Sequence, residues 1–185
     1  MCGISAIINT TQSKPYSHEE YSKQIAQMNQ MLHHRGPDGQ GIWHSQSHQV
    51  YLAHNRLSII DLSSNGLQPM HSWDKSYVLI FNGEIYNYRE LREECMQLGS
   101  RFLTHSDTEV ILECYRHWGE QCLKRFQGMW AFILLDKEQN KLLISRDPFG
   151  IKPLYYGFLR GHFYFASEPK ALTCLSGYFS EEDLV

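Results

Sequence analysis

Short apolar runs separated by turn residues dominate the chain and predict β-strands. The first run, Gly3–Asn9, is typical of a buried strand. Further strands are expected near Gly41–Ser45, Val50–His54, Ser58–Leu62, Tyr77–Phe81, Trp130–Leu135, Lys141–Arg146, Pro153–Gly157 and His162–Ala166. The last four runs follow one another across short turns, which favours antiparallel pairing.

Three segments have the end signals of helices. Each begins at a polar cap residue with a Glu three positions later, and apolar residues at helical spacing support the first of them. The predicted helices run from Ser17 to about His33, from Asn87 to Gly99 and from Ser106 to Gly119. A Gly-Pro turn ends the first helix, and glycines end the other two.

The helices lie between two groups of strands instead of alternating with each strand. This order favours an α+β fold, with helices covering two antiparallel sheets, over a doubly wound α/β sheet. The 185 residues correspond to about one domain, which we assign to residues 1–185. Residues from about 175 to 185 are polar and acidic, and we expect a tail or the start of a linker there.

Composition and charge argue against several classes of protein. Hydrophobic residues make up 42% of the chain and charged residues 20%, as in a globular protein rather than a disordered one. The net charge of −3 offers no basic surface for nucleic acid. No apolar run approaches the roughly 18 residues of a membrane span, and the first residues do not form a secretory signal. We therefore expect a cytoplasmic protein without a membrane partner.

The cysteines support the same location. There are five, and no C-x-x-C pair occurs, so neither a disulfide framework nor a zinc site is expected. Cys95, Cys114 and Cys122 lie beside apolar residues and are interpreted as small core residues. Cys2 is different, because removal of Met1 would expose a thiol and an α-amine on one residue. Such a residue can act as a nucleophile that carries its own base.

Sequence patterns for metal and nucleotide binding are absent. The chain has no H-E-x-x-H and no G-x-x-x-x-G-K-[ST], and the glycines after Arg35 do not follow a strand as a dinucleotide fingerprint does. We therefore expect no metal and no cofactor in this domain.

Several motifs together closely resemble the N-terminal glutaminase domain of glutamine-dependent asparagine synthetases, which are class II (N-terminal nucleophile) glutamine amidotransferases. The resemblance extends from Cys2 to about Ala171. Its motifs are M-C-G-I at the start, H-R-G-P-D-G at 34–39, L-A-H-N-R-L-S-I-I-D-L at 52–62, Q-P-M at 68–70, F-N-G-E-I-Y-N-Y at 81–88, T-H-S-D-T-E-V-I-L at 104–112, F-Q-G-M-W-A-F at 126–132 and R-D-P-F-G-I-K-P-L-Y-Y at 146–156. The family fold is a four-layer α-β-β-α sandwich of two antiparallel sheets, the N-terminal-nucleophile hydrolase fold.

The resemblance implies catalytic roles for three residues. Cys2 would attack the side-chain amide of glutamine and form a γ-glutamyl thioester. The Asn82 side-chain amide and the Gly83 backbone N–H would form the oxyanion hole, because the tetrahedral intermediate needs donors that are already in place.

The resemblance also implies how the substrate's own ends are held. Arg56 would bind the α-carboxylate through its two parallel N–H groups. The family residues that receive the α-ammonium correspond to Asp107 and Glu84. Backbone groups of Leu57, Ser58, Ile59 and Ile60 would line the same pocket.

Each residue has a simpler local interpretation as well. Cys2 could be an incidental cysteine at a loose terminus, and Asn82-Gly83 is a common hairpin turn. Asp107 could be a first-turn acid that complements a helix dipole, and Arg56 a surface charge on a strand. It is the joint match of all the motifs that favours the functional roles.

The function implied by the resemblance is hydrolysis of L-glutamine to L-glutamate and ammonia. In a full-length enzyme the ammonia would pass to a synthetase domain or subunit and on to aspartate, and ATP and Mg²⁺ would bind only there. Two alternatives remain open: an amidotransferase domain that serves a sugar or a cell-surface precursor, and a non-catalytic glutamine-sensing or assembly module if Met1 is retained. A homodimer is also left open.

Overall fold

The computed structural model describes residues 1–10, 16–47 and 49–175. Its strands are β1 (Gly3–Asn9), β2 (Gly39–His44), β3 (Val50–Arg56), β4 (Met70–His71), β5 (Tyr77–Ile85), β6 (Gly128–Asp136), β7 (Lys141–Arg146), β8 (Tyr155–Leu159) and β9 (His162–Ala166). Its helices are α1 (His18–Met31), α2 (Tyr88–Gln97), α3 (Asp107–Trp118) and α4 (Lys170–Thr173), with 3-10 turns η1 (His33–Arg35), η2 (Ser64–Gly66) and η3 (Gly119–Arg125). Nearly all of the predicted tail lies outside the described residues. None of the helices in the described ranges is long and apolar enough to cross a membrane.

The chain divides into two compact units, and each has its own sheet. The first unit comprises Met1–Leu57 and Pro153–Val185, and the second comprises Ser58–Lys152. The strand order is β2-β3-β1-β9-β8 in the first unit and β4-β5-β6-β7 in the second, with every pair antiparallel. The α+β class with two antiparallel sheets is therefore confirmed within the described residues.

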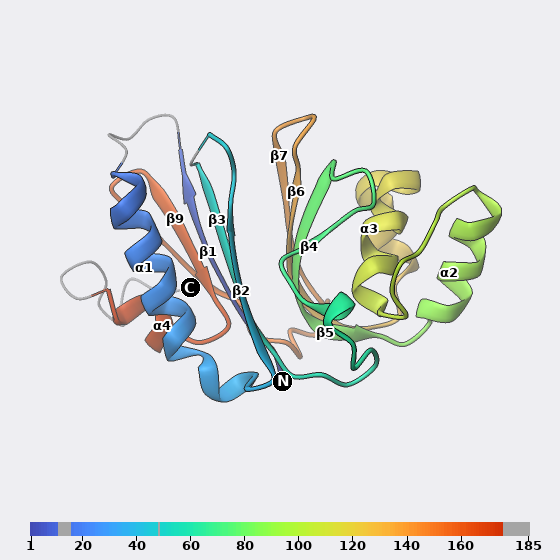
Figure 1. Cartoon of the computed structure of the whole chain (residues 1–185), viewed down its shortest axis with the longest axis horizontal. Helices are drawn as coiled ribbons and strands as arrows, with labels where there is room; N and C mark the ends of the chain where they lie inside the picture. Colours follow the sequence, from blue (N-terminus) through green and yellow to red (C-terminus); the bar gives the residue numbers. More distant parts are fainter. Residues whose placement is uncertain (11–15, 48, 176–185) are drawn as a thin grey trace. The chain divides into compact units, whose positions relative to one another are not determined.

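In the first unit, α1 and α4 cover one face of the sheet (Figure 1). Alternate residues of the strands, among them Ile7, Tyr51 and Tyr164, pack with α1 residues into one fully buried cluster. The predicted capping box begins the helix: Ser17 Oγ accepts from the backbone N–H of Glu20, whose carboxylate accepts from the N–H of Ser17. The first predicted helix is thus confirmed, and η1 continues the chain toward Gly36.

In the second unit, α3 lies against one face of the sheet, and α2 lies on the same side and packs against α3 (Figure 1). Leu79, Phe81 and Ile85 of β5 face these helices and belong to their core cluster. The cysteines interpreted as core residues also lie there, fully buried, and the Sγ atoms of Cys95 and Cys114 are 3.8 Å apart. That interpretation is confirmed.

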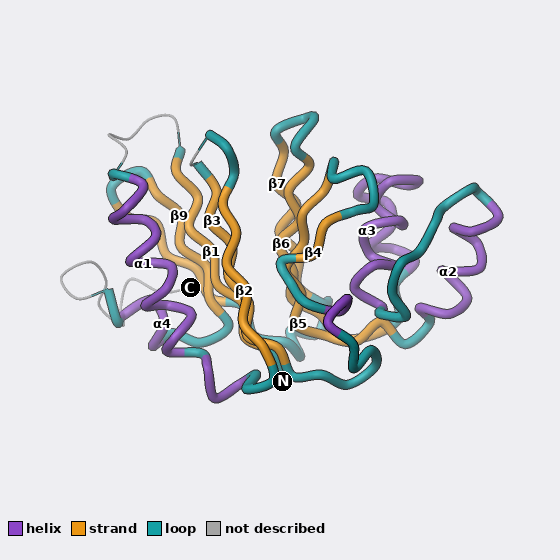
Figure 2. Tube along the Cα trace, in the orientation of Figure 1, coloured by secondary structure: helices purple, strands orange, loops and turns teal. Residues whose placement is uncertain are grey.

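Several local predictions need correction. The predicted strand over Ser58–Leu62 is a loop, which Figure 2 shows between β3 and β4. Asp61 Oδ1 accepts from both the N–H and the hydroxyl of Ser63, and such local bonds compete with a ladder. Asn87 precedes α2 but makes no side-chain cap, because its amide joins Arg125 and Gln127 instead. Strand β8 begins two residues later than predicted, and β4 was not predicted at all.

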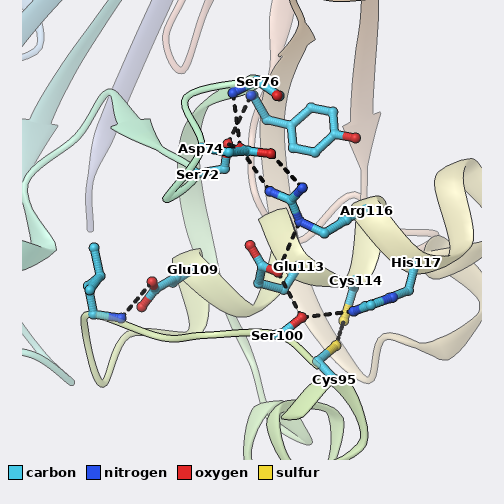
Figure 3. A network of polar contacts seen from close by, with 12 residues as sticks. Ser72, Asp74, Ser76, Cys95, Ser100, Glu109, Glu113, Cys114, Arg116 and His117 are labelled. Carbon is cyan, nitrogen blue, oxygen red and sulfur yellow. Dashed lines mark hydrogen bonds and ion pairs between the residues drawn. The ribbon is translucent and has the colours of Figure 1, made fainter. Parts of the chain in front are cut away.

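A polar network fastens the turn between β4 and β5 to α3 (Figure 3). Arg116 donates Nη1 to Asp74 Oδ2 at 2.6 Å and Nη2 to Asp74 Oδ1 at 2.9 Å, a two-point contact between planar groups. Asp74 also accepts from the Ser72 hydroxyl and the Ser76 N–H. The hydrogen bond from Arg116 is the main reason that the pKa of Asp74 lies well below its usual range.

Replacing Asp74 with Asn removes the charge from this pair. We expect Asp74→Asn to lower the free energy of unfolding at pH 7 by about 1–2 kcal/mol, since hydrogen bonds to charged groups are the strong ones and this pair is partly exposed. Because the folded-state pKa is depressed, the contribution is present above the ordinary pKa of Asp, about 3.9, and is lost as the pH falls below it. Urea unfolding at pH 7 and near pH 3 measures both effects.

The exposed Glu93 of α2 provides the matched control in the same unit. Glu93→Gln removes one carboxylate from the helix surface and should change the free energy of unfolding by less than about 0.5 kcal/mol. Equal stabilities for wild type and Asp74→Asn at pH 7 would show that the pair contributes nothing.

Candidate functional site

The predicted site residues fall into two groups, one in each unit. Cys2, Arg56 and Leu57 belong to the first unit, whereas Ser58, Ile59, Ile60, Asn82, Gly83, Glu84 and Asp107 belong to the second.

Cys2 directly precedes β1, and Arg56 ends the neighbouring strand β3. Gly3 pairs with Asn55, so the same register carried one residue further sets Cys2 opposite Arg56. Directly opposite residues of an antiparallel pair have Cβ atoms roughly 4.5–5.5 Å apart on one face. Ile7 of β1 and Ala53 of β3 pack under α1. Cys2 and Arg56 are separated from them by an odd number of positions along their strands, so they lie on the face away from α1. The structure therefore brings the predicted nucleophile and the predicted carboxylate-binding residue side by side.

Backbone groups of Leu57 contact the thiol of Cys2, and the side chain of Arg35 holds its main chain. The Leu57 N–H donates to Sγ at 3.4 Å, and Sγ lies 3.7 Å from the Leu57 carbonyl oxygen. Arg35 donates Nε to the Cys2 carbonyl oxygen at 2.9 Å. The interpretation of Cys2 as an incidental residue at a loose terminus does not fit these contacts, because its sulfur and its carbonyl are both held.

Arg56 is only 7% exposed, so the interpretation as a surface charge is wrong. The H-R-G-P-D-G segment packs directly against the end of its strand: the Asp38 N–H donates to the Arg56 carbonyl at 2.9 Å. A Cβ at Gly36 would lie 2.4 Å from the Asn55 carbonyl carbon, so only glycine allows this approach. The motif therefore has a structural role in fixing β3.

Asn82 and Gly83 lie within strand β5, not in a turn. Asn82 pairs with Ala131 and Gly83 with Trp130 of β6, so the hairpin interpretation is wrong. A Cβ on Gly83 would lie 2.3 Å from the Met129 carbonyl oxygen, which explains why glycine occupies this strand position.

The N–H of Gly83 points away from β6. Trp130, its partner, directs both its N–H and its carbonyl toward Asp147 instead. Gly83 and Trp130 therefore form a non-hydrogen-bonded pair, in which the strand's polar groups point to the opposite edge. The N–H groups two residues away on that edge are occupied: Phe81 donates to Gln68 Oε1 at 2.6 Å, and Ile85 donates to Asp107 Oδ2 at 3.0 Å. The Gly83 N–H between them has no acceptor among the described residues.

The Asn82 side chain projects from the face of β5 opposite the helices, as does that of Glu84, because Phe81 and Ile85 face the core. Asn82 is 2% exposed, and its Nδ2 is buried without a hydrogen-bond acceptor in the described part of the chain. A buried amide donor without a partner is costly. The second unit thus carries two adjacent donors, Asn82 Nδ2 and Gly83 N–H, that are available to a ligand.

Asp107 is the first residue of α3 and is 5% exposed. It is a first-turn acid, as its simpler interpretation predicted, and it also caps the Ile85 N–H at the edge of β5. Burial raises the pKa of Asp107 to about 6, against the opposing effect of its backbone hydrogen bonds, and the negative charge of Glu84 raises it further.

Ser58, Ile59 and Ile60 lie in the loop after β3, where Ile59 is 69% exposed. Their role in a pocket stays a prediction. Two residues that the sequence did not predict to be functional contact the backbone at the site. Gln68 occupies the edge of β5, and Arg35 holds Cys2. Both lie inside quoted motifs, Q-P-M and H-R-G-P-D-G, and that was the signal that could have identified them.

Among the described residues, no group of three or more His, Cys, Asp or Glu side chains is arranged to hold a metal ion. That this domain needs no metal or cofactor stays a prediction.

Comparison with known proteins gives one consistent result. The profile of the glutamine amidotransferase domain matches residues 1–183. The chain is 48% identical over 172 residues to asparagine synthetase [glutamine-hydrolyzing] 1 of Bacillus subtilis, covering 93% of this chain and 26% of that protein. It is 46% identical over 157 residues to asparagine synthetase B of Escherichia coli, covering 83% of this chain and 27% of that protein. The chain thus spans about a quarter of the length of these relatives.

The fold is shared more widely than the sequence. A solved glutamine phosphoribosylpyrophosphate amidotransferase from B. subtilis superposes with a TM-score of 0.78 at 20% identity, covering 100% of this chain and 48% of that one. The predicted N-terminal-nucleophile hydrolase fold is therefore confirmed. With the profile match over nearly its whole length, the chain belongs to the glutamine amidotransferase domain family, and its relatives carry the same domain at the start of asparagine synthetases.

Proposed function

We propose that this domain hydrolyses the side-chain amide of L-glutamine, with Cys2 as the nucleophile once Met1 is removed. The observation that carries the proposal is the pair of available donors at Asn82 Nδ2 and Gly83 N–H. Donors held ready before the reaction stabilise an oxyanion that exists only in the transition state and the intermediate.

The reaction proceeds through two tetrahedral intermediates. The α-amine of Cys2 takes the thiol proton while Sγ bonds to the amide carbon, and the carbonyl oxygen becomes an oxyanion. As this intermediate collapses, the ammonium group donates its proton to the amide nitrogen, so that ammonia leaves and a γ-glutamyl thioester remains. The amine then activates a water molecule, whose attack on the thioester releases glutamate and restores the thiol.

The remaining site residues orient the substrate. The buried Arg56, beside Cys2 on the same sheet face, binds the α-carboxylate, and a planar guanidinium suits that geometry. Asp107 and Glu84 receive the α-ammonium. Backbone groups of Leu57 to Ile60 line the pocket, and the Leu57 peptide already contacts Sγ.

The relatives named glutamine-hydrolysing asparagine synthetases support aspartate as the final acceptor of the ammonia. A synthetase domain or subunit that binds ATP and Mg²⁺ would make that transfer, while the glutaminase domain itself would need no cofactor. An acceptor such as a sugar stays the alternative, because acceptor chemistry lies outside this domain. Cytoplasmic location and a homodimer stay predictions.

The first test separates a hydrolase from a blocked binding module. Cys2→Ala should abolish release of glutamate from glutamine in a Met1-free preparation, because the thioester cannot form. Cys174→Ala is the matched control, since that thiol is also half-buried and lies in the same unit. It should keep wild-type turnover. Ordinary turnover by the Cys2→Ala protein would overturn the mechanism.

The second test concerns the oxyanion donors. Asn82→Ala should lower kcat by about 10²–10³-fold and change KM much less, because the Asn82 amide meets charge that develops only during the reaction. The pH midpoint of the kcat profile should stay that of the wild type, since the Cys2 amine remains the base. Full kcat in the variant would remove Asn82 from the oxyanion hole.

The third test uses the pKa of Asp107, which burial raises to about 6. A protonated carboxyl cannot pair with the substrate ammonium, so KM for glutamine should rise as the pH falls through 6. A single group with this pKa predicts a KM about tenfold higher at pH 5 than at pH 7. Asp107→Asn should show a raised KM with no such pH dependence. A wild-type KM that is flat from pH 5 to 7 contradicts the assignment.

A further inference from the structure

A partly buried ion-pair network lies behind the main chain of Cys2. Arg35 donates Nε to the Cys2 carbonyl at 2.9 Å and Nη1 to Glu168 Oε1 at 2.6 Å. The side chain of Arg35 is 8% exposed and that of Glu168 is 23% exposed, so solvent screens this pair less than a surface ion pair. The carboxylate of Glu168 is thus connected to the nucleophile through a single guanidinium.

Glu168 is the carboxylate that compensates the charge of Arg35. The remaining donor, Arg35 Nη2, is buried and has no acceptor among the described residues. Glu168 also accepts from His34 Nε2 at 3.1 Å and contacts Lys170 Nζ at 3.0 Å. Burial alone would raise the pKa of Glu168, but its bonds from Arg35, Lys170 and His34 outweigh that effect and lower the pKa to about 2. Glu168 therefore stays ionised at every pH of an ordinary assay.

The same segment also holds the strand that follows Cys2. The Ile4 N–H donates to Ser167 Oγ at 3.0 Å, and the Ser167 N–H donates to the Ile4 carbonyl at 3.0 Å. Ser167 and Glu168 thus fix the first residues of the chain at two points, Ile4 directly and Cys2 through Arg35.

The network lies close to the α-amine that removal of Met1 would expose, because the nitrogen and carbonyl oxygen of one residue are never more than about 4 Å apart. The charged or titratable groups around Cys2 come from η1 and the turn after it, from β3 and from the segment after β9. They are His34, Arg35, Asp38, Arg56, Glu168 and Lys170. Asp38 is exposed, whereas Glu168 is the carboxylate that pairs directly with Arg35.

We propose that Glu168 is a positioning residue for the nucleophile: through Arg35 it fixes the main chain of Cys2, and its negative charge keeps the Cys2 α-amine basic enough to take the thiol proton. The inference rests on the proposed function, in which that amine is the general base. Without the carboxylate, Arg35 and Lys170 would favour the uncharged amine, and the amine would lose its proton at a lower pH.

The test compares the pH profiles of charge-changing variants in Met1-free protein. Glu168→Gln should move the midpoint of the kcat profile down by about half a pH unit, as expected for one charge at this distance near the surface. The looser Cys2 should also lower kcat roughly tenfold while KM stays within about twofold. Lys170→Gln removes a half-exposed positive charge from the same network and should move the midpoint up by a smaller amount. Glu94→Gln, which removes the carboxylate partner of Arg125 in the other unit, should leave kcat, KM and the midpoint unchanged.

A second measurement does not need turnover. The rate at which iodoacetamide alkylates Cys2, followed by peptide mass analysis, reports the ionisation of the thiol as a function of pH. Its midpoint should also move down in Glu168→Gln, because the lost negative charge favours the thiolate. If wild type releases no glutamate, the proposed function fails, whereas the alkylation profile still tests Glu168.

Unmoved kcat and alkylation midpoints in Glu168→Gln would overturn the proposal and leave Glu168 a merely structural residue. If that variant does not fold, a midpoint in Lys170→Gln that is unmoved or lowered would overturn it equally.

Discussion

The alternation of hydrogen bonds along β5 is the constraint on which the second unit's part of the site depends. In an antiparallel ladder every second residue turns its N–H away from a given neighbour. Asp147 fixes this alternation at Gly83. Its carboxylate accepts from the Trp130 N–H and its N–H donates to the Trp130 carbonyl, so neither backbone group of Trp130 is directed to Gly83. A shift of one residue would turn the Gly83 N–H into the sheet and the Asn82 side chain into the core. The placement of the proposed oxyanion donors, Asn82 Nδ2 and the Gly83 N–H, therefore depends on the register between β5 and β6.

Gln68 and Asp107 complete this arrangement by occupying the flanking N–H groups of the same edge. An exposed strand edge presents a row of unpaired N–H and C=O groups. Because the N–H groups of Phe81 and Ile85 have acceptors, the Gly83 N–H between them is the one that the described residues leave available to a ligand along this stretch. The burial of Asp107 has two effects. The burial that lets its carboxylate reach the Ile85 N–H also raises its pKa to about 6, so under the proposed function substrate binding would be sensitive to mild acid.

The strands and helices were largely predictable from the sequence because their periodicity and caps are local, as in Gly3–Asn9 and the capping box of Ser17. Asn82-Gly83 was ambiguous because its structure depends on residues far along the chain and not on local signals. Its local preference is for a turn, and the crowding that requires glycine comes from Met129, almost fifty positions later. The Ser58–Leu62 segment has strand composition, but Asp61 within it bonds to nearby Ser63 and to the distant His105 N–H instead of leaving the segment free to join a ladder. Arg35 and Gln68 were not assigned roles because the contacts that matter at the site are with the backbone of Cys2 and Phe81, and a backbone partner has no side chain that the sequence could identify.

A nucleophile at the second position faces a physical difficulty, because chain ends normally fray. Ordering one residue costs roughly 1–2 kcal/mol of backbone entropy, which the contacts of that residue must offset. Here the contacts of Cys2 use its carbonyl, held by Arg35, and its sulfur, held by the Leu57 peptide. Removal of Met1 changes neither atom, since it alters only the nitrogen. These contacts are already present with Met1 in place, so in the proposed mechanism removal of Met1 adds the base to a thiol that is already positioned.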